Sequence, residues 1–66
     1  MRIVYDESND ILYIRLRDTP VIETDELRPG LFADVDKDGL IVGFEILDAK
    51  DVIADPGLVD LETLTA

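Results

Sequence analysis

The fold is decided by residues 31–47, which read LFADVDKDGLIVGFEIL. Two runs of apolar, β-branched and aromatic residues flank the stretch Lys37-Asp38-Gly39, and this pattern is typical of a β-hairpin. A type I turn with Gly39 in the left-handed conformation, followed by a bulge, is the turn that the loop favours. Pro29-Gly30 marks a further turn just before the hairpin.

The predicted turn also fixes which residues pair across this hairpin. It places Asp36 opposite Leu40 and Phe32 opposite Phe44, with Asp34 opposite Val42. Side chains alternate between the two faces of a strand, so this register puts apolar residues on both faces, and both need covering. One predicted face holds Phe32, Leu40, Val42, Phe44 and Ile46, and the other holds Leu31, Ala33, Val35 and Ile41.

A second hairpin is predicted from the first seventeen residues. Arg2–Tyr5 is a short β-type segment, residues 6–10 form a polar turn, and residues 11–17 alternate between apolar and polar side chains. Within the turn, Asn9 is the best candidate for a left-handed backbone conformation. Residues 21–27 fit either a short polar edge strand or an irregular segment.

The C-terminal stretch changes to a helical pattern. Asp48 is placed to cap a helix turn, and Pro56 suits a first helical position. Leucines at 58, 61 and 64 then form an apolar stripe at helical spacing. We therefore expect one short helix or two helical turns lying across one face of the sheet.

Together these elements predict a single α+β domain over residues 1–66. Its first part, 1–47, is a small antiparallel β-meander of four to five strands with two hairpins, and 48–66 is the helical segment. The predicted core consists of Tyr5, Leu12, Ile14, Leu16, Phe32, Val42, Phe44 and Ile46.

Composition narrows the possible functions. The chain has 66 residues, no cysteine, no histidine and a net charge of −10. So small a domain buries little of its surface and has no disulfides to stabilise it, which favours a homodimer. The negative charge disfavours nucleic acid and would attract a basic protein partner. No run of residues is long and apolar enough for a membrane span, no signal peptide is recognisable, and we expect a cytoplasmic protein without a cofactor.

One motif points to calcium. Residues 34–39, DVDKDG, with Glu45 at the twelfth position, match an EF-hand loop, in which Asp34, Asp36 and Asp38 would supply carboxylate oxygens. An EF-hand also needs flanking helices, whereas this loop lies between β-type runs. In a strand Glu45 would lie roughly 20 Å beyond the turn and could not reach the ion. An acidic hairpin turn is therefore expected, with cation binding by the three aspartates as the alternative.

The remaining candidate chemistry points to an interaction surface rather than an active site. Ser8 has no histidine to activate it, and a small sheet has little room for a cleft between paired carboxylates, so we expect no catalytic residues. Alternation places Tyr13, Arg15 and Arg17 on one strand face, a pattern that can bind single-stranded nucleic acid. The net charge favours instead an exposed face whose arginines pair with nearby acidic residues, and a protein interface is a third possibility. The candidate interface residues are Tyr13, Arg15, Arg17, Leu31, Val35 and Ile41.

Two motifs resemble a known family. The first is Tyr5-Asp6 followed by residues 10–16, and the second is Pro29-Gly30 followed by residues 34–39 and 41–49. Over roughly residues 2–50 the chain resembles domain of unknown function 2283, a family of small prokaryotic proteins. The resemblance implies a β-meander with a C-terminal helical piece, and no established activity. It also suggests an antitoxin-like role, because members are often encoded beside small toxin-like proteins.

Overall fold

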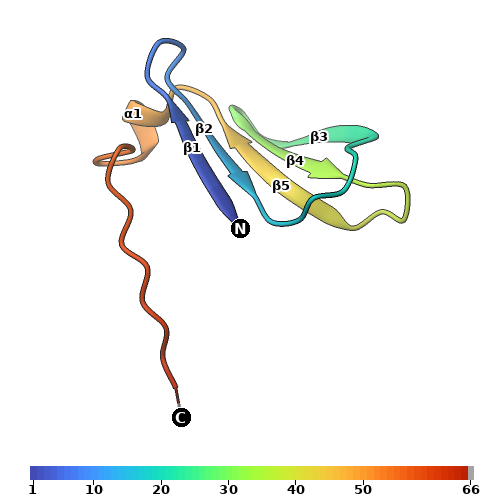
Figure 1. Ribbon diagram of the computed structural model, residues 1–66. Helices are drawn as coiled ribbons and strands as arrows, with labels where there is room; N and C mark the ends of the chain where they lie inside the picture. The colour runs from blue at the N-terminus through green and yellow to red at the C-terminus, as the bar shows by residue number, and fades with distance from the viewer. Residues whose placement is uncertain (66) are drawn as a thin grey trace.

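The computed structural model describes residues 1–65 and shows one five-stranded antiparallel sheet with a single short helix (Figure 1). The strand order is β1-β2-β5-β4-β3. The sheet is therefore not the sequential β-meander that the sequence predicts, because β2 pairs with β5, the last strand of the chain, rather than with β3. The protein is thus mostly β. The elements are β1 (Arg2–Asp6), β2 (Ile11–Arg15), β3 (Glu23–Arg28), β4 (Leu31–Val35), β5 (Ile41–Ile46) and α1 (Ala49–Val52).

The open question about residues 21–27 is settled by β3, which forms an edge strand beside β4. All six of its residues are exposed, and four of them are charged. A charged edge strand discourages pairing with further strands. The opposite edge, β1, carries exposed Ile3 and Val4 instead.

The register divides the sheet into two faces. The apolar face carries Ile3, Tyr5, Leu12, Ile14, Leu31, Ala33, Val35, Val42, Phe44 and Ile46. The mixed face carries Arg2, Val4, Tyr13, Arg15, Phe32, Asp34, Gly43 and Glu45. Both faces therefore hold apolar side chains, and the charged ones gather on the mixed face.

The register of the second hairpin differs from the predicted one by one residue. The turn is as expected: the backbone N–H of Asp36 donates to the carbonyl of Leu40 at 3.0 Å, and Gly39 has a φ of 78°. A bulge follows, however, because Val35 pairs with residue 41 while Asp34 pairs with residue 43. One extra residue on a strand moves everything beyond it to the other face.

The bulge therefore corrects two predicted pairings. Phe32 lies opposite Glu45 rather than Phe44, and Asp34 lies opposite Gly43 rather than Val42. Phe32 consequently lies on the mixed face, away from the other predicted core residues. Leu31, Ala33 and Val35 share the apolar face with Phe44 instead of opposing it.

The core is small. Four apolar side chains are buried among residues 1–65, namely those of Leu12, Ala33, Val42 and Ala49. Of the predicted core, Leu12 and Val42 are thus confirmed, whereas Leu16 is exposed. The other five predicted core residues, Tyr5, Ile14, Phe32, Phe44 and Ile46, are half-buried.

The helix is shorter than the sequence pattern suggests. Asp48 occupies the N-cap position but adopts the left-handed conformation and makes no capping bond with its side chain. The capping role passes to Asp10, whose carbonyl accepts the N–H of Ala49 at 3.0 Å and whose carboxylate accepts that of Lys50 at 3.2 Å. Asp10, not Asn9, is also the left-handed residue of the first turn, with a φ of 54°.

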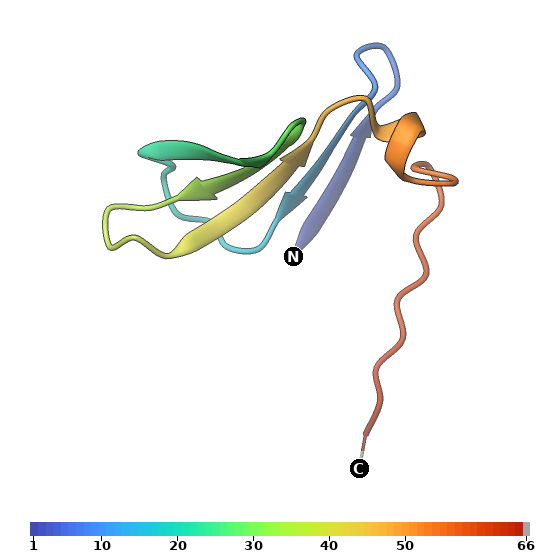
Figure 2. The same ribbon diagram turned by 180° about the vertical axis from the view of Figure 1, so that it is seen from behind.

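Residues 53–65 carry no helix or strand and leave the sheet in an extended course. Both views show this C-terminal segment descending from α1 clear of the strands (Figures 1 and 2). Pro56 begins a tight turn, closed by the Leu58 N–H donating to the Asp55 carbonyl at 3.1 Å, rather than a helix. The predicted leucine stripe is therefore exposed, with Leu61 and Leu64 at 78% and 85% of full exposure. No helix of the described residues is long and apolar enough to cross a membrane.

Candidate functional site

The mixed face contains an open hollow of about 750 Å³ where β1 begins and β2 ends. Gly43 faces this region between Arg15 and Asp34, which are its partners on the two neighbouring strands. Because Gly43 has no side chain, the sheet surface there is low. The hollow is lined by Met1, Arg2, Val4, Tyr13, Ile14, Arg15, Leu16, Arg17, Asp18, Asp34 and Phe44.

Three of the six basic residues of the chain line this hollow. Arg2 lies directly opposite Arg15 in the β1–β2 register, and like charges in that position destabilise a strand pair. The Arg15 guanidinium donates to the carbonyls of Arg17, at 2.8 Å, and Thr19, at 2.7 Å. Both acceptors are neutral, so these bonds position the side chain without cancelling its charge.

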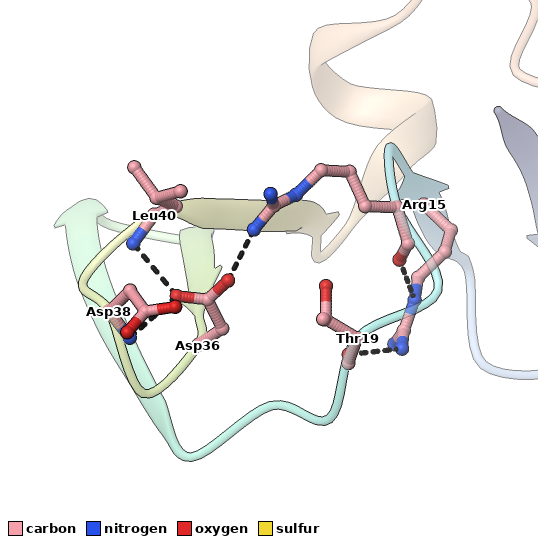
Figure 3. Close-up of polar contacts among 6 residues, drawn as sticks. Arg15, Thr19, Asp36, Asp38 and Leu40 are labelled. Atoms are coloured by element: carbon pink, nitrogen blue, oxygen red, sulfur yellow. Dashed lines mark hydrogen bonds and ion pairs between the residues drawn. The ribbon is translucent and has the colours of Figure 1, made fainter.

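Arg17 is the one arginine of the hollow with an ion pair in the described part of the chain. Its guanidinium pairs with the carboxylate of Asp36, which is 4% exposed (Figure 3). The same carboxylate accepts the backbone N–H groups of Asp38, at 2.9 Å, and Leu40, at 3.0 Å. The Leu40 bond is the main reason that the pKa of Asp36 lies below its usual value, with Asp38 and Arg17 acting in the same direction and burial opposing them.

These contacts explain the acidic turn without a metal ion. Asp36 organises the turn between β4 and β5, as aspartates at such positions commonly do. Asp34 instead lies on the mixed face, where its carboxylate accepts the hydroxyl of Thr24 at 2.8 Å. Among residues 1–65 no three acidic side chains gather as metal ligands, so Asp34, Asp36 and Asp38 do not form one site.

Asp34 forms a second polar feature of the mixed face with Glu45. Hydrogen bonding with Asp34 is the largest reason that the pKa of Glu45 is raised, followed by burial and by the charge of Asp34. Two carboxyl groups that share a proton resist ionising together. Glu45 therefore binds its proton more firmly than an isolated glutamate does.

The predicted interface residues lie in three places. Tyr13, Arg15 and Arg17 line the hollow together, as their alternation on one strand suggests. Leu31 and Val35 lie on the apolar face and are half-buried. Ile41 lies at the bulge with 44% of its surface exposed.

A family described as a protein of unknown function, DUF2283, matches residues 2–50. The chain belongs to the DUF2283 family. No significant match was found among curated proteins or among solved structures. The DUF2283 match spans all five strands and the first residues of α1 and ends before the C-terminal segment.

Two residues of this DUF2283 domain make contacts that the sequence pattern does not indicate. The sequence pattern places Arg2 only in a short strand, whereas the structure places it opposite Arg15 at the hollow. The sequence pattern places Asp10 only in a turn, whereas in the structure its carboxylate accepts the backbone N–H of Lys50 in α1, 40 positions away in the sequence. A pairing of β1 with β2 in register would have revealed Arg2, whereas no local signal points to the contact of Asp10.

Proposed function

We propose that this protein is a non-enzymatic interaction module that works as a homodimer. The observation that carries the proposal is the imbalance between buried and exposed apolar side chains. Four apolar side chains are buried within residues 1–65, while fifteen large ones expose more than a third of their surface. A domain of this size is marginal even when its core is complete, and a second copy supplies the missing apolar contacts.

The exposed apolar residues favour a protein as the missing layer. They lie on β1, on both faces of the sheet and along the C-terminal segment. Extended apolar patches on a small domain are characteristic of protein interfaces. Tyrosine and arginine, which interfaces use preferentially, are both present in the hollow.

Sedimentation equilibrium across the micromolar range tests the homodimer. The proposal predicts a single species of about twice the chain mass of 7.4 kDa. A monomer throughout that range would refute it. Leu27→Ser serves as a control, because Leu27 is an exposed apolar residue on the charged edge strand β3 and its loss is expected to leave the dimer intact.

A basic protein is the second partner that this chain fits, in an antitoxin-like role. Acidic side chains recur from the end of β5 onward, at Asp48, Asp51, Asp55, Asp60 and Glu62, with Lys50 as the one basic residue among them. Such a surface steers a positively charged partner toward it. A tagged copy expressed in its native host should capture a small basic protein whose binding weakens with salt, and capture of neutral or acidic proteins alone would contradict this role.

A non-enzymatic role also agrees with the polar groups on the sheet. The chain lacks cysteine and histidine, and the buried carboxylate, Asp36, is occupied by backbone N–H groups and Arg17. The raised pKa of Glu45 has a structural explanation in its neighbour Asp34 across β4 and β5. Each titratable group singled out by its environment thus serves the fold.

A further inference from the structure

The C-terminal segment, residues 53–65, has the acidic and apolar composition of a peptide ligand, and its apolar side chains from Leu58 onward are exposed. Residues 53–65 contain no basic side chain, and their large apolar side chains from Leu58 onward expose between 53% and 85% of their surface. In an extended chain, side chains two residues apart point to the same side. Leu58, Asp60, Glu62 and Leu64 therefore form one side of the segment, with two carboxylates between two leucines.

The hollow on the mixed face has the complementary pattern. Arg2 and Arg15 lie opposite each other, and neither has a carboxylate partner within residues 1–65. Val4 and Tyr13 form the next pair on the same face, and Leu16 follows Arg15. Two adjacent positive charges are thus bordered by apolar side chains.

We propose that the C-terminal segment of one copy lies in the hollow of a second copy, with Asp60 and Glu62 on Arg2 and Arg15 and with Leu58 and Leu64 against the apolar border. The proposal rests on the homodimer and specifies how it forms. Carboxylates two positions apart in an extended chain are separated by about 7 Å, and Arg2 and Arg15 occupy directly opposed positions on paired strands.

Charge supports this match. Arg17 is already paired with Asp36, whereas Arg2 and Arg15 line the hollow without a carboxylate partner within residues 1–65, although the chain has a net charge of −10. The repulsion between Arg2 and Arg15 costs stability while the hollow is free. Carboxylates placed between them reverse that cost and gain charge-assisted hydrogen bonds.

The course of the segment favours a second copy over the same chain. In both views it leaves α1 beyond the β1 edge and points away from every strand (Figures 1 and 2). An exchange between two copies is self-consistent, since each copy gives one segment and receives one, as a two-fold axis requires. It also covers the exposed leucines and the hollow at once.

Cysteine pairing tests the exchange directly, because the chain has no cysteine of its own. One chain carries Val4→Cys in the hollow, and a second chain with a mass tag carries either Leu58→Cys or Leu64→Cys. After mixing and mild oxidation, mass spectrometry should show a covalent heterodimer in several-fold excess over the control pair. The control replaces the tail cysteine by Val52→Cys, which is 70% exposed on α1.

Charge reversal gives an independent readout. Arg2→Glu places opposite charges across β1 and β2, so it does not weaken that strand pair, but it should raise the dimer dissociation constant at least tenfold. Arg28→Glu on β3 makes the same change far from the hollow and should leave the constant within about twofold. Added salt should weaken the wild-type dimer and have less effect on the Arg2→Glu variant.

The possible failures are distinguishable. A dimer whose tail cysteines pair no better than the Val52→Cys control would overturn the tail exchange and leave the homodimer intact. A single chain carrying both Val4→Cys and Leu64→Cys that closes on itself as a dilute monomer would assign the tail to its own hollow. A chain that sediments as a monomer would remove both proposals.

Discussion

Replacing Gly43 by alanine should destabilise the protein strongly, although only one methyl group is added. A Cβ built at this position would lie 2.4 Å from the carbonyl oxygen of Ile14 on the neighbouring strand. Ordinary contacts of this kind begin near 3.4 Å, so β2 and β5 would have to separate locally by about 1 Å. The obstacle is backbone rather than a flexible side chain, and it lies beside the bulge and in the centre of the sheet.

The expected cost follows from this overlap. Overpacking costs about 1–3 kcal/mol, and weakening a backbone hydrogen bond of the ladder adds about 1 kcal/mol. We therefore expect Gly43→Ala to lower the free energy of unfolding by about 2–4 kcal/mol. For a domain of this size that corresponds to a fall in Tm of roughly 10–25 °C.

Two other glycines provide matched controls. Gly39 has a φ of 78° but open space around it, so Gly39→Ala should cost only the left-handed strain of about 1–2 kcal/mol. Gly57 has neither feature, its nearest atom lying at 3.8 Å, and Gly57→Ala should change stability by less than about 0.5 kcal/mol. Thermal unfolding followed by circular dichroism ranks the three. A Gly43→Ala variant with the same Tm as the Gly57→Ala variant would refute the close approach of β2 and β5.

Three further substitutions test separate contacts. The Tyr5 hydroxyl donates to Asp10 at 2.6 Å, and this hydrogen bond is the main reason that the pKa of Tyr5 is raised to about 12. Its stabilisation is complete below pH 10, the ordinary pKa of tyrosine, and should disappear as the pH rises to about 12. Alkaline unfolding curves should show this loss in the unmodified protein and not in Tyr5→Phe. Asp36→Asn should lower Tm at neutral pH, whereas Asp38→Asn should not. Because the pKa of Asp36 is lowered, its carboxylate contributes to stability above the ordinary pKa of an aspartate, and this contribution is lost as the pH falls through the lowered pKa. Thr19→Val should raise the free energy of unfolding by about 1 kcal/mol, since the Thr19 hydroxyl is buried without a hydrogen-bond partner among residues 1–65. Denaturant unfolding that shows a lower free energy of unfolding for the variant would contradict this.

The hairpins are predictable from sequence because their signals are local. Residues 31–47 contain a turn with Gly39 between two β-type runs, and the structure reproduces both the turn and its Asp36–Leu40 pairing. The first hairpin follows from the same alternation. Turn residues and two-residue periodicity report on neighbours in the chain, and hairpins join such neighbours.

The faces of β4 were predicted incorrectly because a bulge has no comparable signal. The extra residue at Val42 changes the partner of Phe32 from Phe44 to Glu45. No local feature of the sequence signals this bulge, which lies between β4 and β5. Register is thus decided by tertiary contacts that periodicity alone does not contain.

The C-terminal segment shows the same limit in another form. The spacing of Leu58, Leu61 and Leu64 matches a helix, yet α1 ends at Val52. A four-residue helix gains little from its own hydrogen bonds, and this one is held by the distant carboxylate of Asp10. Pro56 is buried, but the apolar side chains from Leu58 to Leu64 are exposed, so the leucines at helical spacing gain no packing that would support a helix.

The central claim is that the fold is completed by a second chain, and the dependence of Tm on protein concentration tests it most directly. Unfolding of two 66-residue chains carries an entropy of about 0.3 kcal/mol/K. A tenfold change in concentration contributes about 1.4 kcal/mol to a dimer. If folding and association are coupled, Tm should therefore rise by about 5 °C for each tenfold increase in concentration. A Tm that stays constant over two such steps would show that the single chain folds alone and would contradict the account.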